Sequence, residues 1–155
     1  MKTDGGQSRS FLRRSAEVTV VAAALVCLGF SAAAQAPESF SARLTVMPID
    51  DATRADVTGS GSGSAVLDDG RLVVSGAFSG LRGPATVARL HEGLATGIRG
   101  GALFELSVVA GVDGTFTGEV DLTREQVQRL RQGRWYIQIH SETAPEGNLW
   151  GWLLQ

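Results

Sequence analysis

Apolar and polar residues alternate with a period of two along most of the chain after residue 39. In the segment Phe40–Val46 the even-numbered positions are apolar, which predicts a strand whose even side chains face inward and which ends at Met47-Pro48. Gly, Asp and Ser clusters separate further short apolar runs. The pattern predicts an all-β fold, an antiparallel β-sandwich of Ig-like or Greek-key type with about eight strands. The further runs are residues 57–67, 72–74, 85–91, 102–109, 115–122, 135–140 and 149–154.

Glycine and serine alternate between residues 57 and 64, a composition that is also found in flexible linkers. The alternation continues into Ala65-Val66-Leu67, and Asp69-Gly70 stands before the apolar residues 72–74. Asp-Gly is a strong signal for a two-residue hairpin turn. We therefore predict a β-hairpin here in preference to a linker.

One short segment has the punctuation of a helix. Thr123 is a suitable N-cap residue, and Gln126 stands three positions later, which completes a capping box. Gly133 provides a stop signal. The sequence predicts one short helix near residues 123–132.

The N-terminal part has the pattern of a secretory signal peptide. A basic stretch precedes an apolar run at residues 18–30, and the small residues Ala32 and Ala34 follow. The run is shorter than the roughly 20 residues of a membrane-spanning helix. We predict a signal peptide at residues 1–34 and a mature domain at residues 35–155, exported to the periplasm or the medium with no membrane span after cleavage. The alternative is an uncleaved anchor.

Composition and charge narrow the classes of function. Hydrophobic residues make up 43% of the chain, enough for a core, and the net charge of -2 provides no basic surface for nucleic acid. The single cysteine, Cys27, lies inside the predicted signal peptide. The mature domain is therefore expected to contain no disulfide, and nothing in its sequence implies a cofactor.

Motifs in both halves of the domain, taken in their order, resemble those of the CHRD family, the module repeated in chordin. Gly83-Pro84-Ala85 followed by Leu90-His91 is similar to the G-P-A…I-H segment of that family. The C-terminal half is more similar, and the resemblance covers about residues 39–154. The motif residues there are Leu122-Thr123, Gln126, Leu130, Gly133, Tyr136-Ile137-Gln138-Ile139-His140 and Pro145-Glu146-Gly147-Asn148-Leu149-Trp150-Gly151.

The resemblance implies an exported Ig-like or related β-sandwich without an established catalytic activity, and it does not supply a ligand. Three residues depart from the family pattern. Arg89 stands where many relatives have the first histidine of an H-x-H pair, Gln138 replaces an asparagine, and Trp150 replaces an arginine. The first departure removes one candidate metal ligand.

The sequence lacks the common catalytic motifs, such as G-x-S-x-G, a P-loop and H-E-x-x-H. We therefore expect a binding or structural module with no enzymatic activity, whose partner is an unknown extracytoplasmic ligand or protein.

The candidate ligand-binding residues are His91, His140, Tyr136 and Gln138. Strand alternation places Tyr136, Gln138 and His140 together on one face of their strand. On the strand that ends at His91, the same alternation places His91 on the face that points away from the core. Our preferred interpretation is that the two histidines hydrogen-bond to loop backbone and brace the fold.

The alternative is a periplasmic copper- or zinc-binding protein that uses His91 and His140 with a carboxylate, either Glu92 or Glu142. Arg89 argues against this site, because a positive charge near His91 opposes a bound cation.

Two further clusters favour structural roles. Trp150 and Trp152 share a strand face and suggest a carbohydrate platform, but large aromatic residues more often belong to a core. The acidic pairs Asp50-Asp51 and Asp68-Asp69 lack the spacing of a calcium loop and are expected to be solvated turn residues.

Overall fold

The computed structural model describes residues 36–47 and 55–155 of the chain. The predicted signal peptide, its cleavage site after Ala34 and the Asp50-Asp51 pair lie outside the described residues.

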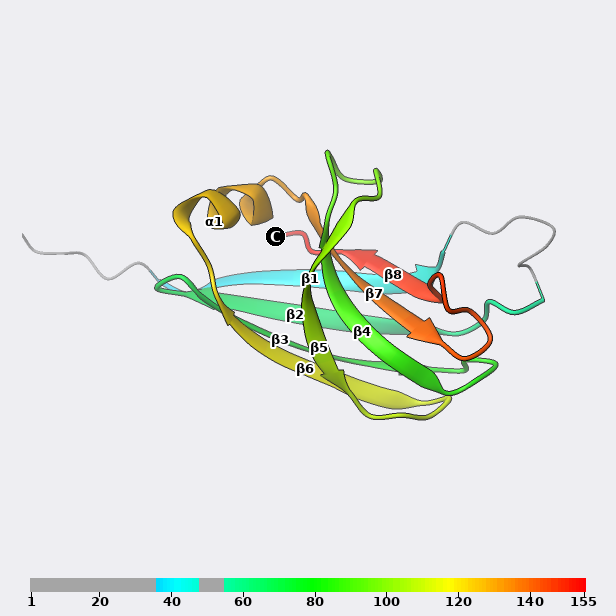
Figure 1. Cartoon of the computed structure of the whole chain (residues 1–155). Helices are drawn as coiled ribbons and strands as arrows, with labels where there is room; N and C mark the ends of the chain where they lie inside the picture. Colours follow the sequence, from blue (N-terminus) through cyan, green and yellow to red (C-terminus); the bar gives the residue numbers. More distant parts are fainter. Residues whose placement is uncertain (1–35, 48–54) are drawn as a thin grey trace, which may run out of the picture. The chain divides into compact units, whose positions relative to one another are not determined.

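The described part of the chain consists of antiparallel strands and one short helix, as Figure 1 shows. The all-β prediction is confirmed, and most strand boundaries lie close to the expected runs. Strand β3 is longer than expected, because it continues past the apolar residues 72–74 to Ser79. The elements are β1 (Glu38–Val46), β2 (Ser60–Asp68), β3 (Arg71–Ser79), β4 (Ala85–Glu92), β5 (Gly101–Val108), β6 (Gly114–Asp121), α1 (Arg124–Arg131), β7 (Trp135–Ser141) and β8 (Leu149–Trp152).

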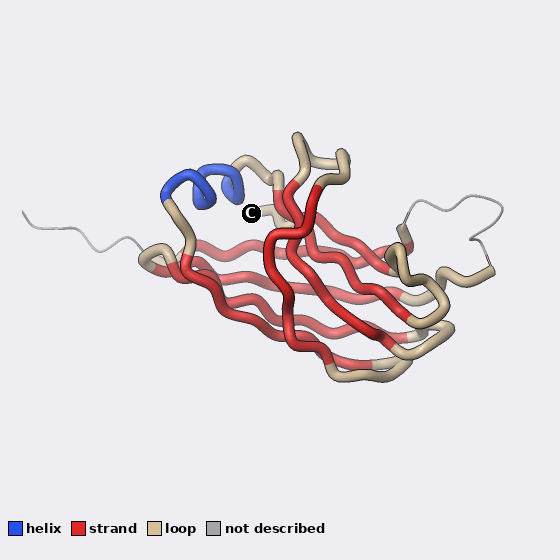
Figure 2. The backbone as a smooth tube through the Cα atoms, viewed as in Figure 1, coloured by secondary structure: helices blue, strands red, loops and turns tan. Residues whose placement is uncertain are grey.

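The strands close into a barrel in the order β1-β2-β3-β6-β5-β4-β7-β8, so the prediction of a sandwich is wrong in this respect. Figure 2 shows the strands in red and helix α1 in blue. Two narrow seams close the barrel. At one seam Thr45 and Val46 of β1 pair with β8, and at the other Ser107 and Val108 of β5 pair with β6. These pairs satisfy part of the backbone groups that the edges of two separate sheets would leave open.

The inner face follows the period-two pattern. Phe40, Ala42 and Leu44 of β1 are buried in the core, as predicted. The glycine-serine segment is strand β2, and it pairs with β3 through the predicted turn. Asp69 and Gly70 both have positive φ, 44° and 84°, which is the geometry of a type I′ hairpin turn. The interpretation as a hairpin is therefore confirmed, and the linker alternative is excluded.

Helix α1 begins with the predicted capping box. The Oγ1 atom of Thr123 accepts a hydrogen bond from the backbone N–H of Gln126, and the Gln126 side chain accepts one from the backbone N–H of Thr123. Gly133, with φ of 67°, follows the helix. Leu130 anchors the helix, because its fully buried side chain belongs to the barrel core.

Candidate ligand site on the outer face of β4 and β7

Strand β7 is buried on both of its faces. Trp135, Ile137 and Ile139 point into the barrel core, which confirms the predicted inward face. Tyr136 and Gln138, which alternate with them, point outward and are nevertheless only 1% and 2% exposed. His140 shares this outer face and is 7% exposed. Other parts of the chain must therefore cover the outside of the barrel here.

The connection between β7 and β8, residues 142–148, covers one end of this face. The Nδ1–H group of His140 donates a hydrogen bond to the carbonyl oxygen of Pro145 at 2.8 Å. The side-chain amide of Gln138 donates to the carbonyl oxygen of Glu146 at 2.9 Å. Two side chains of β7 thus hold the loop against the barrel.

The connection between β4 and β5, residues 93–100, projects from the barrel in Figure 1, and its last residue, Gly100, contacts the other end of this face. The carbonyl oxygen of Gly100 accepts hydrogen bonds from His91 Nδ1 at 3.2 Å and from the Tyr136 hydroxyl at 3.0 Å. The predicted role of the histidines in bracing loop backbone matches the contacts of both His91 and His140.

Strand pairing brings the two histidines together on this outer face. Arg89 and His91 of β4 lie opposite Gln138 and Tyr136 of β7, and the register with β5 shifts between Leu90 and His91. The ring centroid of His91 lies 4.9 Å from that of Tyr136. It lies 6.3 Å from that of His140, with 28° between the two ring planes.

Three buried acceptor atoms on this face have no hydrogen-bond donor within the described residues: Nε2 of His91, Nε2 of His140 and Oε1 of Gln138. Each imidazole donates a hydrogen bond from Nδ1–H to a carbonyl oxygen. In a neutral imidazole the other nitrogen, Nε2, then carries a lone pair and no proton. We call these three residues the acceptor row. Buried polar atoms without a partner are uncommon in folded proteins, which makes this row the strongest candidate site.

The surroundings of the acceptor row keep the imidazoles neutral. Burial lowers the pKa of both His91 and His140 below the ordinary histidine value, and the positive charges of Arg89 and Arg99 act in the same direction. The hydrogen bonds to backbone carbonyls act in the opposite direction, as does the negative charge of Glu146 on His140. Neutral imidazoles present lone pairs to a ligand near pH 7.

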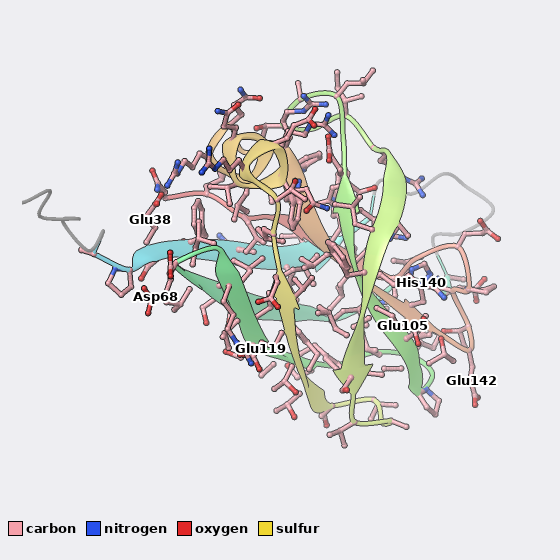
Figure 3. All side chains as sticks on the ribbon, turned by 60° about the vertical axis from the view of Figure 1, so that its left-hand side comes forward. Glu38, Asp68, Glu105, Glu119, His140 and Glu142 are labelled. Carbon is pink, nitrogen blue, oxygen red and sulfur yellow. The ribbon has the colours of Figure 1, made fainter. Side chains whose placement is uncertain are left out.

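The carboxylates that the sequence suggested as metal ligands are engaged elsewhere or point away. Glu92 forms ion pairs with Arg129 at 3.2 Å and Arg134 at 3.1 Å, and its side chain is 11% exposed. Glu142 is exposed, at the outer edge of the loop beyond His140 in Figure 3. In residues 36–47 and 55–155, no three His, Cys, Asp or Glu side chains are grouped so that they hold a metal ion together.

The tryptophans divide between the two faces. Trp135 is fully buried in the core. Trp150 and Trp152 lie outside the barrel, partly buried, with ring centroids 5.9 Å and 4.6 Å from that of Tyr136. They pack beside the acceptor row, so the prediction that they belong to the core is wrong.

Sequence reasoning found the four side chains but missed what covers them. Gly100 and Pro145 contact the histidines through backbone carbonyl oxygens. Every residue has this group, so the sequence does not indicate which residues make such contacts. Arg99 lies in a loop, and its effect on the histidines depends on how that loop folds back. The only available signal was the position of Pro145 inside a family motif.

A family model for the CHRD domain matches residues 40–153. The chain therefore belongs to the CHRD domain family, and the resemblance described from its motifs is confirmed. Membership suggests a binding or structural module. Comparison with curated proteins and with solved structures gives no match. Within the described residues, no helix has the length and hydrophobicity needed to cross a membrane.

Proposed function

We propose that this protein is an exported, non-catalytic CHRD binding module whose ligand site is the acceptor row of His91, Gln138 and His140, flanked by Tyr136. The observation that carries the proposal is the set of three buried acceptor atoms with no donor among the described residues. A ligand that donates hydrogen bonds or accepts lone pairs completes this set, and leaving it incomplete costs about 1–3 kcal/mol per buried atom.

The absence of catalysis is supported by access as well as by the family. The Nε2 atoms are the groups that would act as general bases, and both are buried from solvent. A general base must come within hydrogen-bond reach of the proton that it removes. An organic substrate does not reach these atoms unless a covering loop moves.

Export is supported by the pattern of residues 1–34 and by the family, since CHRD domains occur in extracellular proteins. The mature domain starting near residue 35 contains every residue of the acceptor row, so the proposed site survives processing.

The test is native mass spectrometry of the mature protein isolated from its own host. We expect a bound species whose mass is absent from the His91→Ala and His140→Ala variants. Glu142→Gln, an exposed change on the same covering loop, serves as the control and retains the bound species. A wild-type protein that carries no ligand, or a ligand that survives in both alanine variants, contradicts the proposal.

A further inference from the structure

The size of the site selects a very small ligand. Nε2 of His91, Nε2 of His140 and Oε1 of Gln138 are all buried from solvent. The whole side chains of the two histidines are only 8% and 7% exposed. A ligand that reaches these atoms while the loops stay in place is therefore no larger than a single ion or a water molecule, whereas an organic ligand requires the loops to open.

The tethering of the imidazoles is the arrangement that metal ligands use. A histidine that binds a metal through one ring nitrogen commonly donates the other N–H group to a backbone carbonyl or a carboxylate. His91 and His140 each do so through Nδ1, to Gly100 and Pro145. The hydrogen bonds fix the tautomer and leave Nε2 as the donor atom for a metal.

The separation of the rings distinguishes between coordination geometries. A metal about 2.0 Å from each Nε2 holds two imidazole centroids slightly more than about 6 Å apart when the N–metal–N angle is linear, and about 5 Å apart when it is tetrahedral. The centroids of His91 and His140 lie 6.3 Å apart. An ion that binds both Nε2 atoms without moving the rings would therefore be held in a nearly linear arrangement, which two-coordinate copper(I) favours and zinc does not.

The charges around the site also favour copper(I) over zinc(II). Arg89 and Arg99 place positive charge near both histidines, whereas the negative charge of Glu146 acts on His140 alone. Within the described residues no carboxylate joins the two histidines in a group of three metal-binding side chains. Arg89 is partly compensated by Glu105, 3.4 Å away. A monovalent cation bound by neutral nitrogen ligands suffers less repulsion here than a divalent one.

From these observations we infer that the site holds one copper(I) ion between Nε2 of His91 and Nε2 of His140, with the Gln138 amide oxygen beside it on the same face. This inference rests on the proposed function, because it names the ligand of the same site. It differs from the carboxylate-containing site suggested by the sequence, because Glu92 and Glu142 take no part.

The experiment is an anaerobic competition titration of the mature protein against a chromophoric copper(I) chelator, with zinc(II) titrated separately. We expect one copper(I) ion per chain and weaker binding of zinc(II). His91→Asn and His140→Asn retain a side-chain N–H that can donate to the loop carbonyl but remove Nε2. Each is expected to weaken copper(I) binding more than about 100-fold, beyond the roughly 10- to 100-fold effect of losing an outer partner.

Glu92→Gln is the control, with copper(I) affinity expected to remain within about twofold of wild type. Circular dichroism establishes that each variant is folded. Failure of the wild-type protein to compete for copper(I), unchanged affinity in both asparagine variants, or tighter binding of zinc(II) overturns the inference. If copper(I) fails but native mass spectrometry shows another histidine-dependent ligand, the proposed function stands; if both measurements fail, neither stands.

Discussion

His91 and His140, on neighbouring strands of the barrel, face outward with their ring centroids 6.3 Å apart. Each ring is held by a hydrogen bond from Nδ1 to the carbonyl oxygen of a covering loop. One nitrogen of each imidazole thus braces a loop, and the other is left as a buried lone pair. The structural and ligand-binding interpretations therefore apply to different atoms of the same residues.

The first prediction concerns pH. Burial lowers the pKa of His91 and His140 in the folded protein, so at mildly acidic pH the unfolded chain binds protons more readily than the folded one. The free energy of unfolding of the metal-free protein should be at its plateau above about pH 6.5 and should fall as the pH decreases below that value. Urea unfolding between about pH 7.5 and pH 5 measures the slope.

The control is a His91→Asn/His140→Asn double variant, in which the slope over this range should be much smaller. The charged groups near the two histidines, Arg89, Arg99 and Glu146, are present in both proteins, so they do not cause a difference between the two slopes. Glu38 and Glu119, whose carboxyl pKa values are lowered by arginine partners, affect stability at more acidic pH, below their ordinary value of 4.5. Equal slopes in the two proteins would show that the histidines are not the cause.

The second prediction separates the brace from the lone pair. His140→Ala leaves the Pro145 carbonyl without its side-chain donor and should destabilise the metal-free protein by about 1–3 kcal/mol. His140→Asn supplies an amide donor in nearly the same place and should retain most of this stability. Chemical denaturation gives both values. An equal loss in the two variants would mean that the Nδ1 hydrogen bond does not stabilise the fold.

The third prediction concerns the loop over the acceptor row. Gly147 has φ of 132°, and a Cβ atom there would lie 2.1 Å from Met47 Sδ and 2.3 Å from Gln138 Nε2. Gly147→Ala should displace the loop, destabilise the protein by about 2–4 kcal/mol and weaken ligand binding.

Gly97 provides a matched control. It also has a positive φ, 87°, but a Cβ atom there would meet nothing within 4 Å. Gly97→Ala should cost only the backbone strain, about 1 kcal/mol. If thermal unfolding shows that the two variants are equally stable, close packing of Gly147 against Gln138 does not stabilise the loop.

The fourth prediction tests the barrel interior. A Cβ atom at Gly63 of β2 would lie 2.6 Å from Ile137 Cδ1. Gly63→Ala should therefore destabilise the barrel by about 1–3 kcal/mol, and adding Ile137→Val, which removes Cδ1, should recover part of this loss. Differential scanning calorimetry measures the stability of both variants. The control is Gly101→Ala, where a Cβ atom meets nothing within 4 Å. Equal stability of the Gly63→Ala and Gly101→Ala variants would contradict the predicted packing.

The alternation of residues in β1, the Asp69-Gly70 turn and the Thr123 capping box are local signals, and each predicted its element correctly. Closure of the barrel was not predictable in this way. Strands β1 and β8 are joined through two residue pairs, and one further bridge links Ser41 to Leu154. Strands β5 and β6 are joined through two residue pairs. The side chains at these positions follow the same alternation that a sandwich edge would show. Long-range pairing decides the architecture, and periodicity reports only which face is buried.

The candidate site shows the same limit. Alternation placed Tyr136, Gln138 and His140 on one face, and the structure agrees. The burial of that face depends on Trp150 and Trp152 and on contacts with Gly100 and residues 142–148. The loop contacts are made through carbonyl groups, which every residue carries. Glu92 was adjacent to His91 in sequence, but its neighbours in space are Arg129 and Arg134.

The fifth prediction concerns processing. Expression of the full chain in a secreting host should yield a mature protein whose intact mass corresponds to cleavage after Ala34. Because Cys27 is then removed, dithiothreitol should leave the thermal midpoint of the mature protein unchanged. A mature protein that retains Cys27 would contradict both parts.

The most direct test of the acceptor row is nitrogen-15 NMR of the histidine rings in the mature, metal-free protein at about pH 7.5. The structure predicts that both imidazoles are neutral, with the proton on Nδ1 and an unprotonated Nε2. Adding copper(I), which is diamagnetic, should then shift the Nε2 resonances of His91 and His140 while the Nδ1 protons remain in place. Protons on Nε2 in the metal-free protein, or Nε2 resonances that copper(I) leaves unmoved, would contradict the account.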